Sequence, residues 1–144
     1  MKRIYKFLFI LLFHLPFSVF AQTVAISDFD REDTRDMNFE IIGKMNSNIL
    51  VYKNIRSNHK ISIFDKEMNT LETVKLDFVP DRTFNIDFVS YPDYFIMVYQ
   101  FQKGNILHCM AVKMDANAQK MTEPVEIDTT RIPVMSDNKI YSTI

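Results

Sequence analysis

Alternation of apolar and polar residues with a period of two is the feature that most constrains this chain. The pattern begins at Asn38 and returns in eight short runs separated by turn residues. A period of two places successive side chains on opposite faces of a strand, whereas a helix needs a period near 3.6. The runs are rich in Ile, Val, Phe, Tyr and Thr, which suit a pleated, half-buried surface. The sequence therefore predicts an all-β fold built from antiparallel strands.

The predicted strands form two groups of four, separated by the break at Pro80 to Arg82. The first group covers 39–42, 49–52, 59–64 and 71–78, and the second covers 84–89, 94–101, 106–114 and 124–128. We therefore expect a first four-strand unit at 38–80 and a second at 81–130. Residues 131–144 are expected to begin a third unit or to form a C-terminal tail.

The two units match each other at a nearly constant offset. Val51-Tyr52 corresponds to Val98-Tyr99, 47 residues later, and residues 74–77 correspond to residues 125–128, 51 residues later. A four-strand unit that recurs every ~45–50 residues is typical of a β-propeller blade. Because a propeller closes with at least about four blades, this interpretation implies an N-terminal fragment of a longer protein. If the repeat is accidental, the strands would form a single β-sandwich or small barrel instead.

A short motif strengthens the propeller interpretation. In residues 63–71 (IFDKEMNTL) a strand ends at Asp65, turns and resumes with an apolar residue, and residues 113–119 (KMDANAQ) repeat this pattern around Asp115. The motif resembles the outer half of blades in exported bacterial β-propeller repeat proteins, and the resemblance covers about residues 39–144. It implies a partial propeller of antiparallel four-stranded repeats. The chain departs from that pattern in holding only two glycines, so we expect Asn and Asp to serve its turns.

Residues 1–21 read as a cleavable signal peptide. Three positive charges within the first six residues precede the unbroken apolar run 7–13. Val19 and Ala21 then supply the small-residue pattern that signal peptidase accepts. A histidine and a proline break the apolar run well before the ~20 residues that a membrane-spanning helix needs. We predict cleavage after Ala21, a secreted or periplasmic protein without a membrane span after cleavage, and a polar linker at 22–37.

Charge narrows the range of partners. The chain carries 17 basic and 18 acidic residues, and removal of the signal peptide, which holds three of the basic ones, leaves a net charge of −4. A mildly acidic protein lacks the clustered cations that nucleic acids and anionic membranes attract. We therefore expect a protein, peptide or glycan ligand and no nucleic acid.

The residues offer little sign of catalysis or metal binding. Cys109 is the only cysteine, and an apolar run surrounds it, which favours a small buried hydrophobe. His59 and His108 have no partners at metal-ligand spacing, and we predict no metal, no cofactor and no catalytic residue. Three aromatic residues near one turn and strand are possible ligand-facing residues: Tyr91, Tyr94 and Tyr99.

Three functional hypotheses follow. The first is an exported non-enzymatic β-repeat protein that presents a binding or scaffolding surface. The second is the N-terminal, propeller-like region of a longer secreted hydrolase. The third is a small secreted sandwich with an adhesive or structural role.

Overall fold

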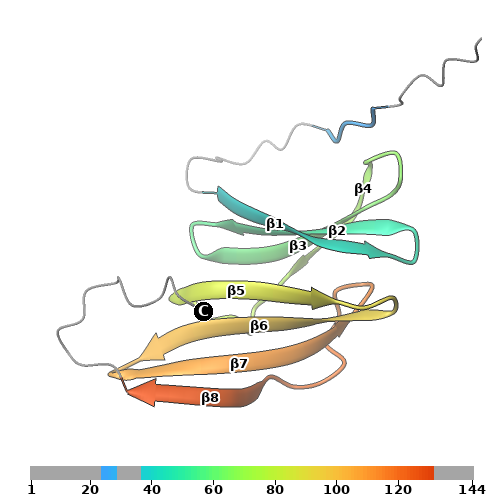
Figure 1. Ribbon diagram of the computed structural model, residues 1–144. Coiled ribbons are helices and arrows are strands. Elements are labelled where there is room, and N and C mark those ends of the chain that lie inside the picture. Colours follow the sequence, from blue (N-terminus) through green and yellow to red (C-terminus); the bar gives the residue numbers. More distant parts are fainter. Residues whose placement is uncertain (1–23, 29–36, 132–144) are drawn as a thin grey trace, which may run out of the picture.

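Strands account for the regular structure of this protein, as Figure 1 shows. The computed structural model describes residues 24–28 and 37–131, and these residues contain eight strands and no helix. The strands are β1 (Met37–Met45), β2 (Asn48–Ile55), β3 (Asn58–Phe64), β4 (Thr70–Lys75), β5 (Thr83–Ser90), β6 (Tyr94–Lys103), β7 (Ile106–Asp115) and β8 (Val125–Arg131). The all-β expectation is confirmed. The predicted signal peptide, residues 22–23 and 29–36 of the predicted linker, and residues 132–144 lie outside the described part.

Each group of four strands forms its own antiparallel sheet in simple chain order. The first sheet has the order β1-β2-β3-β4 and the second has the order β5-β6-β7-β8. Two-residue loops at Asn46-Ser47 and Arg56-Ser57 join β1 to β2 and β2 to β3, with positive φ at all four residues. Two positive φ angles define the type I′ turn, whose twist matches that of a hairpin. Neither loop contains a glycine, so the chain makes tight hairpins despite its low glycine content.

The third hairpin of each sheet uses one and the same turn. Asp65 follows β3, and its Oδ1 accepts hydrogen bonds from the backbone N–H groups of Glu67 and Asn69 at 2.9 and 2.8 Å. Asp115 ends β7, and its Oδ1 accepts hydrogen bonds from the residues two and four positions further on, at 2.9 and 2.8 Å. An aspartate that satisfies nearby amides in this way fixes a local turn. The two sheets therefore carry the same aspartate turn, at positions fifty residues apart in the chain.

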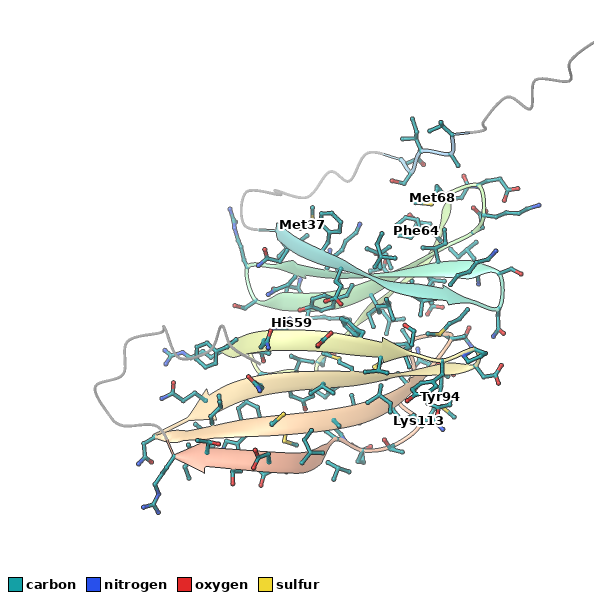
Figure 2. The ribbon with its side chains drawn as sticks, in the orientation of Figure 1. Met37, His59, Phe64, Met68, Tyr94 and Lys113 are labelled. Carbon is teal, nitrogen blue, oxygen red and sulfur yellow. The ribbon has the colours of Figure 1, made fainter. Side chains whose placement is uncertain are left out.

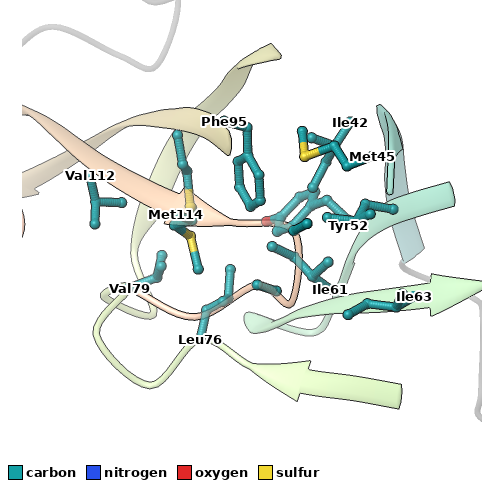
Figure 3. Packing of buried hydrophobic residues seen from close by; sticks show 14 of the residues in the cluster. Ile42, Met45, Tyr52, Ile61, Ile63, Leu76, Val79, Phe95, Val112 and Met114 are labelled. Carbon is teal, nitrogen blue, oxygen red and sulfur yellow. The ribbon is translucent and has the colours of Figure 1, made fainter. Parts of the chain in front are cut away.

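The two sheets pack face to face, and the core lies between them (Figure 3). The first sheet contributes Leu50, Tyr52 and Ile61, and the second contributes Phe95, Met97 and Met114, all of which are buried. Across the interface, the ring centroids of Tyr52 and Phe88 lie 5.3 Å apart. Burial of alternate side chains from both sheets is the main force that holds the sheets together.

The sheets approach each other most closely along their first strands, β1 and β5. The hydroxyl of Ser90 at the end of β5 donates a hydrogen bond to the carbonyl of Ile42 in β1. Gly43 lies at a β-bulge in β1 with φ +150°, and a Cβ built there would lie 3.1 Å from Ser90 Oγ. A larger residue at this position would be strained by its positive φ and would press on the Ser90 side chain, which favours glycine.

The predicted strand 71–78 is too long. β4 ends at Lys75, and the chain then turns inward, so that Leu76 and Val79 are buried in the core. The backbone N–H of Leu76 donates to the carbonyl of His59 at 2.9 Å, and that of Val79 donates to the carbonyl of Leu76 at 3.1 Å. Apolar alternation continues past Lys75 because these residues still face the core, although from a loop rather than a strand.

Candidate functional site

A polar pocket of about 220 Å³ lies where the first strands of the two sheets begin. The first residues of β1 and β5 form two of its sides, and residues of β2 form the third. It lies at the opposite end of β1 and β5 from the tight contact between Gly43 and Ser90. The described residues that line it are Asn38, Phe39, Glu40, Tyr52, Asn54, Thr83, Phe84, Asn85 and Ile86.

Strand register explains why β1 turns polar side chains into this pocket. Asn38 pairs with Asn54, and Glu40 pairs with Tyr52, so these four residues share the face that looks toward the second sheet. Phe39, between them, points to the other face and is 63% exposed. The start of β1 therefore reverses the usual arrangement, with polar residues inside and apolar residues outside.

Among the described residues that line the pocket, Glu40 carries the only carboxyl group. Burial raises the pKa of Glu40, and the negative charge of Asp87 on β5 raises it further. Within the described residues no cation makes an ion pair with Glu40. Among the described residues, the charge of the Glu40 carboxylate is therefore not balanced by an ion pair.

Tyr52 and His59 form a buried pair behind the pocket, and Figure 2 shows His59 between the two sheets. Tyr52 Oη and His59 Nδ1 lie 2.6 Å apart, and only 3% of His59 is exposed. Burial lowers the pKa of His59, and this effect outweighs the opposing effects of the Pro80 carbonyl and of Asp81. Burial raises the pKa of Tyr52, and the negative charge of Glu40 raises it further. Both groups are therefore neutral near pH 7. A phenol is a far stronger acid than a neutral imidazole N–H, so we assign the hydroxyl as the donor and Nδ1 as the acceptor.

Two polar atoms in this region are buried, and neither has a hydrogen-bond partner of ordinary geometry among the described residues. They are Asn54 Oδ1 and His59 Nε2, the ring nitrogen that does not contact Tyr52. Orphaned acceptors and donors of this kind cost about 1–3 kcal/mol each and are rare in folded proteins. Asn54 Oδ1 is therefore a buried acceptor without a partner, in a residue that contributes to the pocket lining.

The three tyrosines proposed as ligand-facing residues do not lie together. Tyr91 and Tyr94 stack with their ring centroids 4.6 Å apart, and Lys113 Nζ lies 3.8 Å above the Tyr94 ring. The expectation that Tyr99 faces a ligand is corrected, because Tyr99 lies on the opposite face of β6 and is only 3% exposed. Its ring packs against Phe78 and Phe101. Its position in β6, an odd number of residues from Tyr94, places it on the core face.

His108 and Cys109 occupy opposite faces of β7. His108 Nδ1 lies 2.6 Å from Glu126 Oε2, and its ring stacks on Phe101 with centroids 4.9 Å apart. Cys109 Sγ lies 3.9 Å from Gln100 Nε2 on the other face. Their side chains therefore point apart and do not form a nucleophile and base pair.

Within residues 24–28 and 37–131, no group of three or more His, Cys, Asp or Glu side chains has the arrangement of a metal site. The same residues include no helix long and apolar enough to cross a membrane. Comparison with protein-family models, with curated proteins and with solved structures finds no match. The polar pocket is therefore identified by its own geometry and chemistry.

Sequence reasoning missed the pocket because its residues come from three strands. Asn38 and Glu40 carried a signal, since polar residues stand at alternate positions of a strand whose intervening residues, Phe39 and Ile41, are apolar. Which of the two sets faces inward depends on the register with β2, and the sequence does not give that register.

Proposed function

We propose that this protein is an exported, non-enzymatic β-repeat protein that binds a small polar ligand in the pocket between β1 and β5. The observation that carries the proposal is the pocket itself, a cavity of about 220 Å³ whose described lining combines the carboxylate of Glu40 with the side chains of Asn38, Asn54 and Asn85. A ligand with several hydrogen-bond donors would pair with such a polar lining. The pocket volume is below the roughly 300–1,000 Å³ of sites that bury drug-sized molecules. A single sugar unit or one peptide side chain is the appropriate size.

The arrangement of the sheets supports a repeat architecture. Both sheets are four-strand meanders in chain order, both carry the aspartate turn at their third hairpin, and their first strands approach each other most closely. Successive propeller blades combine these features, because the first strand of each blade lies nearest the central axis. Phe39 and Ile41, both more than 60% exposed, lie on the outer face of the first sheet, where a propeller would place another blade. We therefore interpret the sheets as two blades and the pocket as an opening between their inner strands.

Export is the part of the proposal that rests on the sequence alone. The basic residues, apolar run and small residues of 1–21 favour a signal peptide. N-terminal sequencing of the protein recovered from the periplasm or medium is expected to begin at Gln22. Recovery of the intact chain with Met1 in the cytoplasm would contradict export.

Ligand binding is tested with a library of monosaccharides, amino acids and small amines, observed by saturation-transfer NMR. Ligands that bind the wild-type protein are expected to lose their signal with Asn54→Leu, which removes the acceptor at similar volume. Asn105→Leu, in the β6–β7 turn, is the matched control and is expected to retain binding. Equal unfolding midpoints would show that both variants are folded. Absence of any signal that depends on Asn54 would refute the proposed function.

A further inference from the structure

We propose that copies of this chain associate head to tail, with the outer face of the first sheet of one copy packed on the outer face of the second sheet of another. The outer faces are those that point away from the core between the two sheets. This inference extends the repeat architecture of the proposed function and does not depend on the polar pocket. The observation that carries it is the strand register of the two sheets.

The aspartate turns and the strand pairing determine which positions of the two sheets correspond. The residue before each turn aspartate pairs with Ile49 on β2 in the first sheet and with Phe95 on β6 in the second. Ile49 therefore corresponds to Phe95, and Tyr52 corresponds to Val98. The sequence comparison matched Tyr52 with Tyr99 and was therefore one residue out of register.

A shift of one residue decides which faces correspond, because successive side chains of a strand point to opposite faces. Tyr52 belongs to the core, whereas Val98 lies on the face of β6 opposite to that of the core residue Tyr99. The core face of the first sheet therefore corresponds to the outer face of the second, and the outer face of the first corresponds to the core face of the second. Figure 1 agrees, because β1 and β5 run in the same direction. The two sheets thus face the same way, so their stacking can be repeated at both ends.

The outer face of the first sheet carries counterparts of the residues with which the second sheet packs on the first. Phe39 and Ile41 on β1 correspond to Ile86 and Phe88 on β5. Ile86 and Phe88 pack against the core, whereas Phe39 and Ile41 are exposed. Phe64, on the same outer face, is buried. The available packing surface therefore follows β1.

The outer face of the second sheet is apolar at the positions that correspond to the core. Val98, Ala111 and Val125 are direct cross-strand neighbours on β6, β7 and β8, and Val125 is exposed. Their counterparts in the first sheet, all in the core or packed against it, are Tyr52, Ile61 and Val74. Exposed apolar patches mark interaction sites. Since β5 covers the counterparts within the chain, the surface that fits here is the outer face of β1, which has the same pattern as β5.

The charges of the two outer faces differ in sign. Among the described strand residues, the register places four cations and no carboxylate on the outer face of the first sheet: Lys44, Lys53, Lys60 and Lys75. It places three carboxylates and one cation on the outer face of the second sheet: Asp87, Asp115, Asp128 and Lys113. Asp77, just after β4, pairs with Lys75. Opposite charges favour contact between unlike faces and oppose contact between like faces.

The contact between copies is expected to be weaker than the contact within the chain. Val89 occupies the position in the second sheet that Gly43 occupies in the first. Gly43 allows the close approach of β1 and β5, whereas the branched side chain of Val89 keeps a docked β1 further away. We therefore expect association that is reversible and depends on concentration.

Sedimentation velocity of the mature protein between about 5 and 500 μM tests the proposal. The wild type is expected to change from monomer to larger species across this range. Ile41→Glu and Val125→Lys each add to the charge already present on one outer face, and each is expected to weaken self-association about tenfold or more. Met121→Glu and Met121→Lys, in the β7–β8 loop, are the matched controls and are expected to associate like the wild type. The three side chains are 64%, 59% and 54% exposed, so all the variants are expected to fold, and equal unfolding midpoints verify this.

Mixing the variants separates head-to-tail association from pairing of like faces. Ile41→Glu and Val125→Lys are each expected to remain monomeric alone and to form a heterodimer when mixed, because each keeps the outer face that the other lacks. Undiminished self-association of either variant would indicate pairing of like faces and would overturn the proposal. A wild type that stays monomeric throughout would also overturn it and would assign the outer faces to another partner. Ligand binding that depends on Asn54 is measured separately, so the two proposals can fail independently.

Discussion

Replacement of Gly43 by alanine tests the contact that joins the two sheets at their first strands. At φ +150° the alanine backbone is strained, and its Cβ would lie 3.1 Å from Ser90 Oγ and 3.4 Å from Ser90 Cβ. Backbone strain of this kind costs of order 1–3 kcal/mol. Displacement of Ser90 would also break its hydrogen bond to the Ile42 carbonyl, which is worth about 0.5–1.5 kcal/mol. We expect Gly43→Ala to lower the free energy of unfolding by about 1.5–4.5 kcal/mol in total.

Gly104→Ala is the matched control. Gly104 has φ +64° in the β6–β7 turn, and an added Cβ would meet no atom within 4 Å. Gly104→Ala should therefore lower the free energy of unfolding only through the cost of a left-handed alanine backbone, about 1 kcal/mol. Gly104→Ala therefore shows how much a positive-φ alanine costs where no contact is made, and the cycle with Ser90 isolates the contact between β1 and β5.

Urea unfolding followed by circular dichroism measures both variants, with Ser90→Ala and the double variant completing a cycle. Removal of Ser90 Oγ relieves the closest contact, so Gly43→Ala is expected to cost less in the Ser90→Ala background than in the wild type. A Gly43→Ala variant as stable as Gly104→Ala, or costs that add without coupling, would refute the described packing of β1 on β5.

Three further predictions concern the core and the buried pair. Tyr52→Phe leaves His59 Nδ1 buried without a donor and should lower the free energy of unfolding by about 1–3 kcal/mol, whereas Tyr91→Phe, in the exposed stack, should have little effect by the same urea assay. Burial lowers the pKa of His59, so the unfolded chain binds a proton first and stability should decline as the pH falls below about 6.5; a pH series of unfolding midpoints that is identical in wild type and His59→Gln would contradict this. Phe95→Ala removes a fully buried ring and should cost about 3–5 kcal/mol, whereas Phe39→Ala at an exposed position should cost far less, and equal losses in thermal unfolding would contradict the assignment of the inner face.

The sequence predicted strands better than it predicted their ends and faces. A period of two identifies strands because alternate side chains must enter one core, and this held for both sheets. The same rule extended the fourth strand to Phe78, since Leu76 and Val79 are buried from a loop. The bulge between Ile41 and Gly43 also escaped prediction, because one extra residue leaves the apolar composition unchanged.

The candidate site could be predicted only in fragments. Tyr91 and Tyr94 lie together, as their spacing suggested, but Tyr99 is in the core. The pocket depends on the pairing of Glu40 with Tyr52 and on the proximity of β5, which are long-range contacts that no local pattern contains.

The most direct test of ligand binding between β1 and β5 is an NMR titration of ¹⁵N-labelled mature protein with the library compound that gives the strongest saturation-transfer signal. We expect the backbone amides of Glu40 on β1 and Asn85 on β5 to shift together with the side-chain amide of Asn54, along one saturable curve. Shifts confined to the Tyr91 and Tyr94 region, or shifts on only one of the two strands, would contradict a ligand held between them.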